Sequence, residues 1–141
     1  MMKSIPVWKQ ELSGGTHAAR LASLYCCAPA ETASEAARYA AVLDGLEKTF
    51  GPHAEAGLYS APGRTEIGGN HTDHQHGRVL AGSVNIDMIA AAAPNDKGQL
   101  RVQSEGYDLC IIDLDDLEAR KEEENTTASL PVSYTHLRAH E

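Results

Sequence analysis

Residues 61–82, APGRTEIGGNHTDHQHGRVLAG, combine many polar and charged side chains in one glycine-rich stretch. His71, Thr72 and Asp73 offer a ring nitrogen, a hydroxyl and a carboxylate that can accept hydrogen bonds from two neighbouring hydroxyl groups. Arg64 adds a permanent cation whose planar donors suit a phosphate or a developing oxyanion. Glycine lets the backbone pass close to a ligand. This combination fits a pocket for a polyol that receives a phosphoryl group.

The same side chains also allow a purely structural interpretation. Thr72 and Asp73 have the side chains that cap turns, and Arg64 lies two residues from Glu66, an acid with which it could pair. The residue types and spacing alone leave the ligand pocket and the capped turn equally open.

A phosphate-binding loop is a further interpretation, suggested by the G-x-x-x-x-G spacing of Gly63 and Gly68. That loop needs a lysine next, to reach the β- and γ-phosphates, and then a serine or threonine to hold Mg²⁺. Gly69 and Asn70 occupy these two positions. We therefore reject the phosphate loop.

A metal site is suggested by four closely spaced potential ligands, His71, Asp73, His74 and His76. Imidazole and carboxylate groups bind zinc and other transition metals. No second group of ligands accompanies them in the sequence, and short histidine-rich patterns have a high false-positive rate. We assign no metal ligand, and a metal-binding module stays an alternative function.

The elements around this stretch change from helical to strand-like along the chain. Apolar spacing predicts a helix over residues 16–28, capped by Thr16, and a second helix that opens with a Thr32–Glu35 capping box and stops at Gly51. Alternation and turn signals then predict strands, of which the one over 84–93 should be mostly buried. The predicted strands cover residues 56–62, 84–93, 99–106 and 109–114. Helices followed by antiparallel strands indicate an α+β fold.

The composition limits the partners that we expect. The 141 residues carry 12 basic and 20 acidic side chains, a net charge of −8. This charge repels nucleic acid and anionic membranes, and no apolar run is long enough to span a bilayer. The three cysteines, two of them adjacent, do not form a disulfide framework. We therefore expect a cytoplasmic protein with no nucleic-acid or membrane partner.

The glycine-rich stretch resembles the galactokinase signature, the first motif of the GHMP small-molecule kinases. That signature runs G-R-x-N-x-I-G-E-H-T-D-Y and continues, a few residues later, with G-x-V-L-P. The helix ending in TFG and the segment APNDKGQLRVQSEGYDLCIIDLDDL extend the resemblance over roughly residues 35–130. The matching residues within the signature are Ala61, Pro62, Gly63, Arg64, Gly69, His71, Thr72, Asp73, Gly77, Val79 and Leu80.

The resemblance implies roles for individual residues. Arg64 would stabilise charge during phosphoryl transfer, and His71, Thr72 and Asp73 would bind the sugar together with Asn70. The family has a glutamate where this chain has Asn70. Asparagine is neutral and one methylene shorter, so the charge-assisted bond to the sugar is lost. This departure bears on which sugar is bound.

Further positions also depart from the signature. Glu66 replaces its asparagine, His74 its tyrosine and Ala81 its closing proline. The family's serine-rich P-x-x-x-G-L-S-S-S-A phosphate loop and the catalytic aspartate beyond it have no match in this chain.

The implied fold is the N-terminal part of the GHMP-kinase N-terminal domain, a mixed β-sheet packed on helices, here incomplete. We expect an N-terminal helical segment over 1–34 and a partial sugar-binding domain over 35–130. Residues 131–141 resemble a translated sequencing-adapter tail, and we expect them to be non-native; a genuine extension is the alternative.

The implied activity is that of a longer parent protein. The parent would transfer the γ-phosphoryl group of ATP, with Mg²⁺, to the anomeric hydroxyl of galactose or a related sugar. The fragment itself has no motif that binds ATP or Mg²⁺, so we expect it to be inactive alone. A non-catalytic sugar sensor descended from the same kinase is the alternative.

Overall fold

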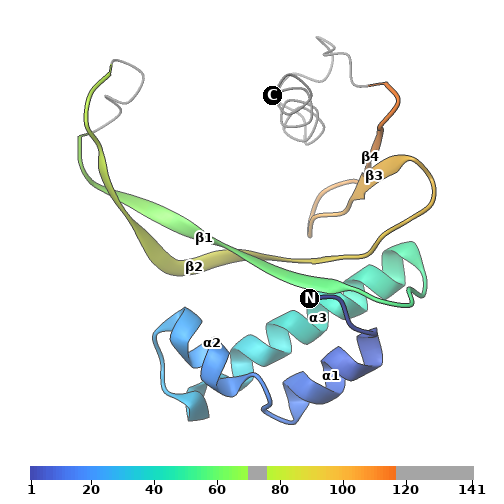
Figure 1. Cartoon of the computed structure of the whole chain (residues 1–141), viewed down its shortest axis with the longest axis horizontal. Coiled ribbons are helices and arrows are strands. Elements are labelled where there is room, and N and C mark those ends of the chain that lie inside the picture. Colours follow the sequence, from blue (N-terminus) through green and yellow to red (C-terminus); the bar gives the residue numbers. More distant parts are fainter. Residues whose placement is uncertain (70–75, 117–141) are drawn as a thin grey trace. The chain divides into compact units, whose positions relative to one another are not determined.

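The computed structural model describes residues 1–69 and 76–116, which divide into two units, Met1–Pro94 and a unit that begins at Asn95. The described part of the first unit contains three helices, a short 3₁₀ turn and a two-stranded ribbon (Figure 1). The described part of the second contains one strand pair. The elements are α1 (Ile5–Ser13), α2 (Ala18–Tyr25), η1 (Pro29–Glu31), α3 (Ala33–Phe50), β1 (Gly57–Gly68), β2 (Leu80–Ala92), β3 (Gln99–Val102) and β4 (Cys110–Asp113).

The first helix, α1, is an element that the sequence analysis did not locate within the expected helical segment. Ile5, Trp8 and Leu12 are its buried residues, and they recur at intervals of three and four, which puts them on one helix face. Pro6 lies in the first turn, where its missing N–H costs no helical hydrogen bond. The signal for this helix is therefore present in the sequence.

The two predicted helices are confirmed, but their predicted caps are wrong. Helix α2 begins after His17 rather than at a Thr16 cap. At the start of α3, the Thr32 hydroxyl donates a hydrogen bond back to the Pro29 carbonyl, and no side chain caps the helix. Glu35 pairs with Arg38 instead of closing a capping box. Gly51 follows the end of α3, as predicted.

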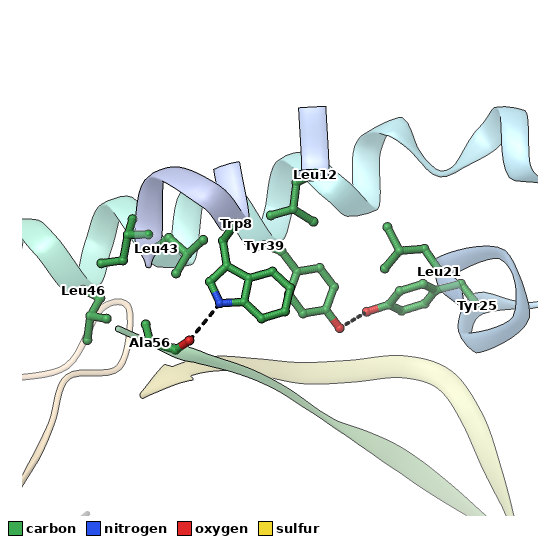
Figure 2. Packing of buried hydrophobic residues seen from close by; sticks show 9 residues of the cluster. Trp8, Leu12, Leu21, Tyr25, Tyr39, Leu43, Leu46 and Ala56 are labelled. Carbon is green, nitrogen blue, oxygen red and sulfur yellow. Dashed lines mark hydrogen bonds between the residues drawn. The ribbon is translucent and has the colours of Figure 1, made fainter. Parts of the chain in front are cut away.

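The core of the first unit lies where the three helices meet the start of the ribbon (Figure 2). The Trp8 indole N–H donates to the Ala56 carbonyl oxygen at 2.8 Å, which joins α1 to the residue just before β1. Backbone bonds between Lys3 and Ala56 run in both directions across an antiparallel bridge. The N-terminal segment is thus part of the same packed unit as α3 and β1. The clustered side chains are Ile5, Trp8, Leu12, Leu21, Tyr25, Tyr39, Leu43, Leu46 and Ala56.

Strands β1 and β2 pair antiparallel as a long ribbon whose two faces differ. One face carries Leu58, Ile89 and Ala91, which pack against the helical core. The opposite face exposes Ile86 and Met88, each residue with 77 % of its area accessible to solvent. The prediction of a mostly buried β2 is wrong because only one face of this strand meets the helices.

In the second unit, β3 and β4 form an antiparallel pair in which Ile112 is buried and Ile111 is exposed. The α+β class is confirmed by helices and antiparallel strands together. Every strand pair within residues 1–69 and 76–116 is antiparallel, so the mixed sheet stays a prediction for a longer chain. The predicted boundaries at 34/35 and 130/131 stay predictions too, and 131–141 lie outside the described residues.

No helix in the described part of the chain is long and apolar enough to cross a membrane.

Candidate functional site

Arg64 lies on β1, and one end of the ribbon that β1 forms with β2 extends beyond the helices (Figure 1). Arg64 is exposed, and its backbone partner across the ribbon is Ser83. A register shift precedes it, because Gly63 alone faces the three β2 residues between Ser83 and Asp87. An irregularity of this kind bends a ribbon and changes the direction of the side chains beyond it. Arg64 is therefore presented by a bent strand and not by a loop.

Gly69 follows the last residue of β1, at the point where the signature continues into residues 70–75. Its φ of 103° lies in a region that other residues rarely adopt, and an added Cβ would lie 2.3 Å from the Arg78 carbonyl oxygen. It would also lie 2.7 Å from the Val79 Cα. The two arms of the signature therefore approach so closely that only glycine fits at Gly69. This close approach is between the backbone at Gly69 and the backbone at Arg78 and Val79 of the same chain.

The remaining predicted site residues, Asn70, His71, Thr72 and Asp73, lie outside the described residues. Their roles in sugar binding stay predictions, as does the alternative in which Thr72 and Asp73 cap a turn. The structure describes the two residues that flank segment 70–75, which are Gly69 and His76.

The metal interpretation concerns mostly the same undescribed segment. Of its four candidate ligands, only His76 is described; it is exposed and has a φ of 59°. Within residues 1–69 and 76–116, no group of three histidine, cysteine or acidic side chains could hold a metal ion.

A buried carboxylate that the sequence analysis missed lies under the ribbon. Tyr25 and Ser60 each donate a hydroxyl hydrogen bond to Asp87 Oδ2 at 2.6 Å, and Arg38 Nη2 donates to Oδ1 at 3.0 Å. The Asp87 side chain is only 3 % exposed. The sequence signal for this carboxylate is a charged residue inside the apolar run VNIDMI. Charged side chains are almost never fully buried unless they are paired, so Asp87 predicts polar partners.

Two opposing effects set the pKa of Asp87. Burial disfavours the charged form and would raise the pKa, but the hydrogen bonds from Ser60, Tyr25 and Arg38 outweigh it. The pKa therefore falls below its ordinary value, and Asp87 is ionised at neutral pH. Burial, followed by the hydrogen bond to Asp87, raises the pKa of the Tyr25 hydroxyl, which stays protonated.

The N-termini of α1 and α3 do not fit the phosphates of ATP. Helix α1 starts with buried Ile5 and with Pro6, which has no N–H to offer. Helix α3 carries Glu35 in its first turn, where a phosphate would need positive potential. We therefore assign no step of any reaction to ATP bound by these residues.

Comparison with known proteins agrees with the placement of the signature on the ribbon. A sequence model described as the galactokinase galactose-binding signature matches residues 46–94, from the end of α3 to the end of the first unit. No solved structure matches the chain.

Curated galactokinases match over part of their length. The galactokinase of Ligilactobacillus salivarius is 36 % identical over 83 residues, which cover 57 % of this chain and 21 % of the relative. That of Streptomyces coelicolor is 36 % identical over 69 residues, covering 49 % of this chain and 18 % of the relative. This chain is galactokinase-like, and it spans about a fifth of the length of the curated galactokinases that it matches.

Proposed function

We propose that this chain is the sugar-binding part of a kinase that transfers the γ-phosphoryl group of Mg·ATP to the anomeric hydroxyl of galactose or a related sugar. The observation that carries the proposal is the match of residues 46–94 to the galactose-binding signature. Arg64 lies on β1 within that signature. Gly69 directly precedes residues 70–73, which would make the other proposed contacts.

Each site residue has a proposed part in this reaction. His71, Thr72 and Asp73 would bind sugar hydroxyl groups, and Arg64 would stabilise the charge that develops on the transferred group. Asn70 would donate or accept one hydrogen bond where the signature has a carboxylate. We place the protein in the cytoplasm, a reducing compartment that suits its free cysteines Cys26, Cys27 and Cys110.

We propose that the 141-residue chain alone does not turn over ATP. Phosphoryl transfer depends on positioning and charge stabilisation, which require groups around the triphosphate as well as around the sugar. The sequence has no serine-rich phosphate loop to hold the triphosphate.

Galactose binding and catalysis test the proposal separately. Calorimetric titration of the chain with galactose should detect binding that Asp73→Asn weakens by about tenfold or more, because a carboxylate bond to a hydroxyl is lost. A matched control is Asp96→Asn, an exposed change in the turn after β2. A coupled assay should show no sugar-dependent ATP turnover by the chain, and turnover by a protein translated from the continued reading frame. Equal galactose affinity of the wild-type and Asp73→Asn chains would overturn the proposed site.

A further inference from the structure

Two cysteines are adjacent at the C-terminal end of α2. Cys26 is the residue that ends the helix, and it is exposed. Cys27 is half-buried and packs against the helical core. An exposed thiol contributes little to packing and is open to reagents in the solvent. The pair therefore offers one accessible sulfur and a second sulfur directly beside it in the chain.

The backbone holds the two cysteines in one tight turn. The amide N–H groups of Cys26 and Cys27 both donate to the Ala22 carbonyl oxygen, the second of them at 3.1 Å. Cys26 has a φ of 54° and a ψ of 41°, the left-handed conformation that commonly ends a helix. Both thiols are thus carried by a turn whose backbone hydrogen bonds converge on a single acceptor.

A direct disulfide between these neighbours is strained. The Cα atoms of consecutive residues are about 3.8 Å apart across a trans peptide bond. The Cα atoms of a relaxed disulfide are roughly 4.4–6.8 Å apart. An atom placed between the two sulfurs lengthens the link and reduces this mismatch. The pair is therefore better suited to hold a thiophilic atom between its sulfurs than to join them directly.

The number of available ligands selects the kind of atom. Structural zinc takes four protein ligands. Within residues 1–69 and 76–116, no group of three histidine, cysteine or acidic side chains could hold a metal ion. A trivalent arsenical with one organic substituent needs just two sulfur ligands, because carbon already fills its third valence. Cys26 and Cys27 can supply both sulfurs without any other residue.

We propose that Cys26 and Cys27 form a dithiol site that chelates monosubstituted trivalent arsenicals. When R–As=O reacts with the pair, both S–H bonds and the arsenic–oxygen bond break, two As–S bonds form, and the oxygen leaves as water. Arsenic stays trivalent, so the step needs no oxidant or reductant. The second As–S bond forms within one molecule, where the neighbouring thiol has a high effective concentration. The chelate is therefore much more stable than an adduct with one thiol.

Chelation also acts on the helical core. To share arsenic with the exposed Cys26, the half-buried Cys27 sulfur gives up packing against the core. The residue before the pair, Tyr25, is buried and donates a hydrogen bond to Asp87 at 2.6 Å, so the disturbed turn adjoins a buried polar contact. The unfolded chain can chelate with no loss of packing, because the two cysteines are adjacent in sequence. The arsenical therefore binds the unfolded chain more tightly and lowers stability.

Phenylarsine oxide is the probe, and native mass spectrometry measures how many molecules remain bound after gel filtration. We expect one per wild-type chain. Cys26→Ser, an exposed change, should abolish this binding, and Cys27→Ala, which keeps an apolar side chain at the core, should abolish it too. Cys110→Ser, in the second unit, is the matched control and should keep one bound molecule. Absence of binding in the wild-type chain, its retention in Cys26→Ser or its loss in Cys110→Ser overturns the site.

Reversal distinguishes a chelate from an adduct with one thiol. Excess 2,3-dimercaptopropanol should remove the arsenical, because it replaces both As–S bonds. The same total thiol concentration of 2-mercaptoethanol should leave it bound. Release by both reagents alike would show that a single sulfur holds the arsenic, and it would overturn the chelate.

Thermal unfolding tests the effect on the core. The bound arsenical should lower the unfolding midpoint of the wild-type chain by about 3 °C or more. Cys26→Ser treated in the same way should show no shift. A bound arsenical that leaves the midpoint unchanged, or raises it, overturns the loss of Cys27 packing. None of these measurements involves galactose, so their outcome is independent of the proposed function.

Discussion

At the residue scale, Gly69 is a position whose identity the backbone dictates. Gly69→Ala should lower the free energy of unfolding by roughly 2 kcal/mol, because a strained φ combines with a backbone clash. The Cβ would lie 2.3 Å from the Arg78 oxygen, and a backbone atom cannot rotate away as a side chain can. Urea unfolding, together with amide exchange at the ribbon end, measures the effect.

The neighbouring glycine is the matched control for this prediction. A Cβ at Gly68 meets nothing within 4 Å, and its φ is not positive. Gly68→Ala should therefore change stability by less than about 0.5 kcal/mol. Equal effects of the two substitutions would show that the close approach of the two arms is not what requires Gly69.

Asp87 gives a pH-dependent prediction at the same scale. Because its folded pKa is lowered, its contribution to stability is present above the ordinary aspartate pKa and is lost as pH falls through the folded value. Asp87→Asn should cost about 1.5–3 kcal/mol at pH 7, the range for hydrogen bonds to charged groups. The difference from the parent chain should shrink below about pH 4. Urea unfolding at pH 7, 5 and 3 tests this, and a difference independent of pH contradicts it.

At the element scale, α1 depends on Trp8 for its attachment to the ribbon. Trp8→Ala should destabilise the chain by about 3–5 kcal/mol, since a large buried side chain leaves a cavity. Trp8→Phe keeps an aromatic ring but loses the bond to the Ala56 carbonyl, which still accepts from the Lys3 amide. It should cost about 1 kcal/mol for this bond, measured by thermal unfolding.

Val7 is the control within the same helix. It is 41 % exposed, on the side of α1 away from the core. Val7→Ala should alter stability by no more than about 0.5 kcal/mol. Because alanine favours a helix more than valine does, a loss comparable with that of Trp8→Ala would contradict the assignment of Val7 to the exposed face.

At the scale of the first unit, the outer face of the ribbon is an apolar surface. Tyr59, Ile86 and Met88 are each more than half exposed on this face. Exposed apolar patches and unpaired strand edges favour self-association. Met88→Glu should therefore reduce self-association in sedimentation velocity with little change in unfolding free energy, because Met88 is 77 % exposed.

The residue next to Met88 on the opposite face provides the contrast. Ile89 packs against the core, so Ile89→Glu should lower stability by about 2 kcal/mol or more through burial of a charge. Equal self-association of Met88→Glu and the parent chain would show that the outer face does not drive association.

The sequence by itself determined the positions of α2 and α3, the strand character of β1 to β4 and the galactokinase-like signature. Each of these depends on local periodicity or on residue order along a short stretch. The Ile5, Trp8 and Leu12 spacing also predicts α1, but only the folded chain shows that it joins the core of α3 and β1.

Tertiary structure decided the features that depend on residues far apart in sequence. The apolar run of β2 predicted a mostly buried strand, and the structure exposes one face because the helices cover only the other. The partners of Asp87 lie 27 to 62 residues away, so no local pattern identifies them. The need for glycine at Gly69 arises from the returning backbone at Arg78. Local sequence determines whether a segment favours a helix or a strand and which of its side chains share a face. The elements that pack against the segment in the folded chain decide whether that face is buried.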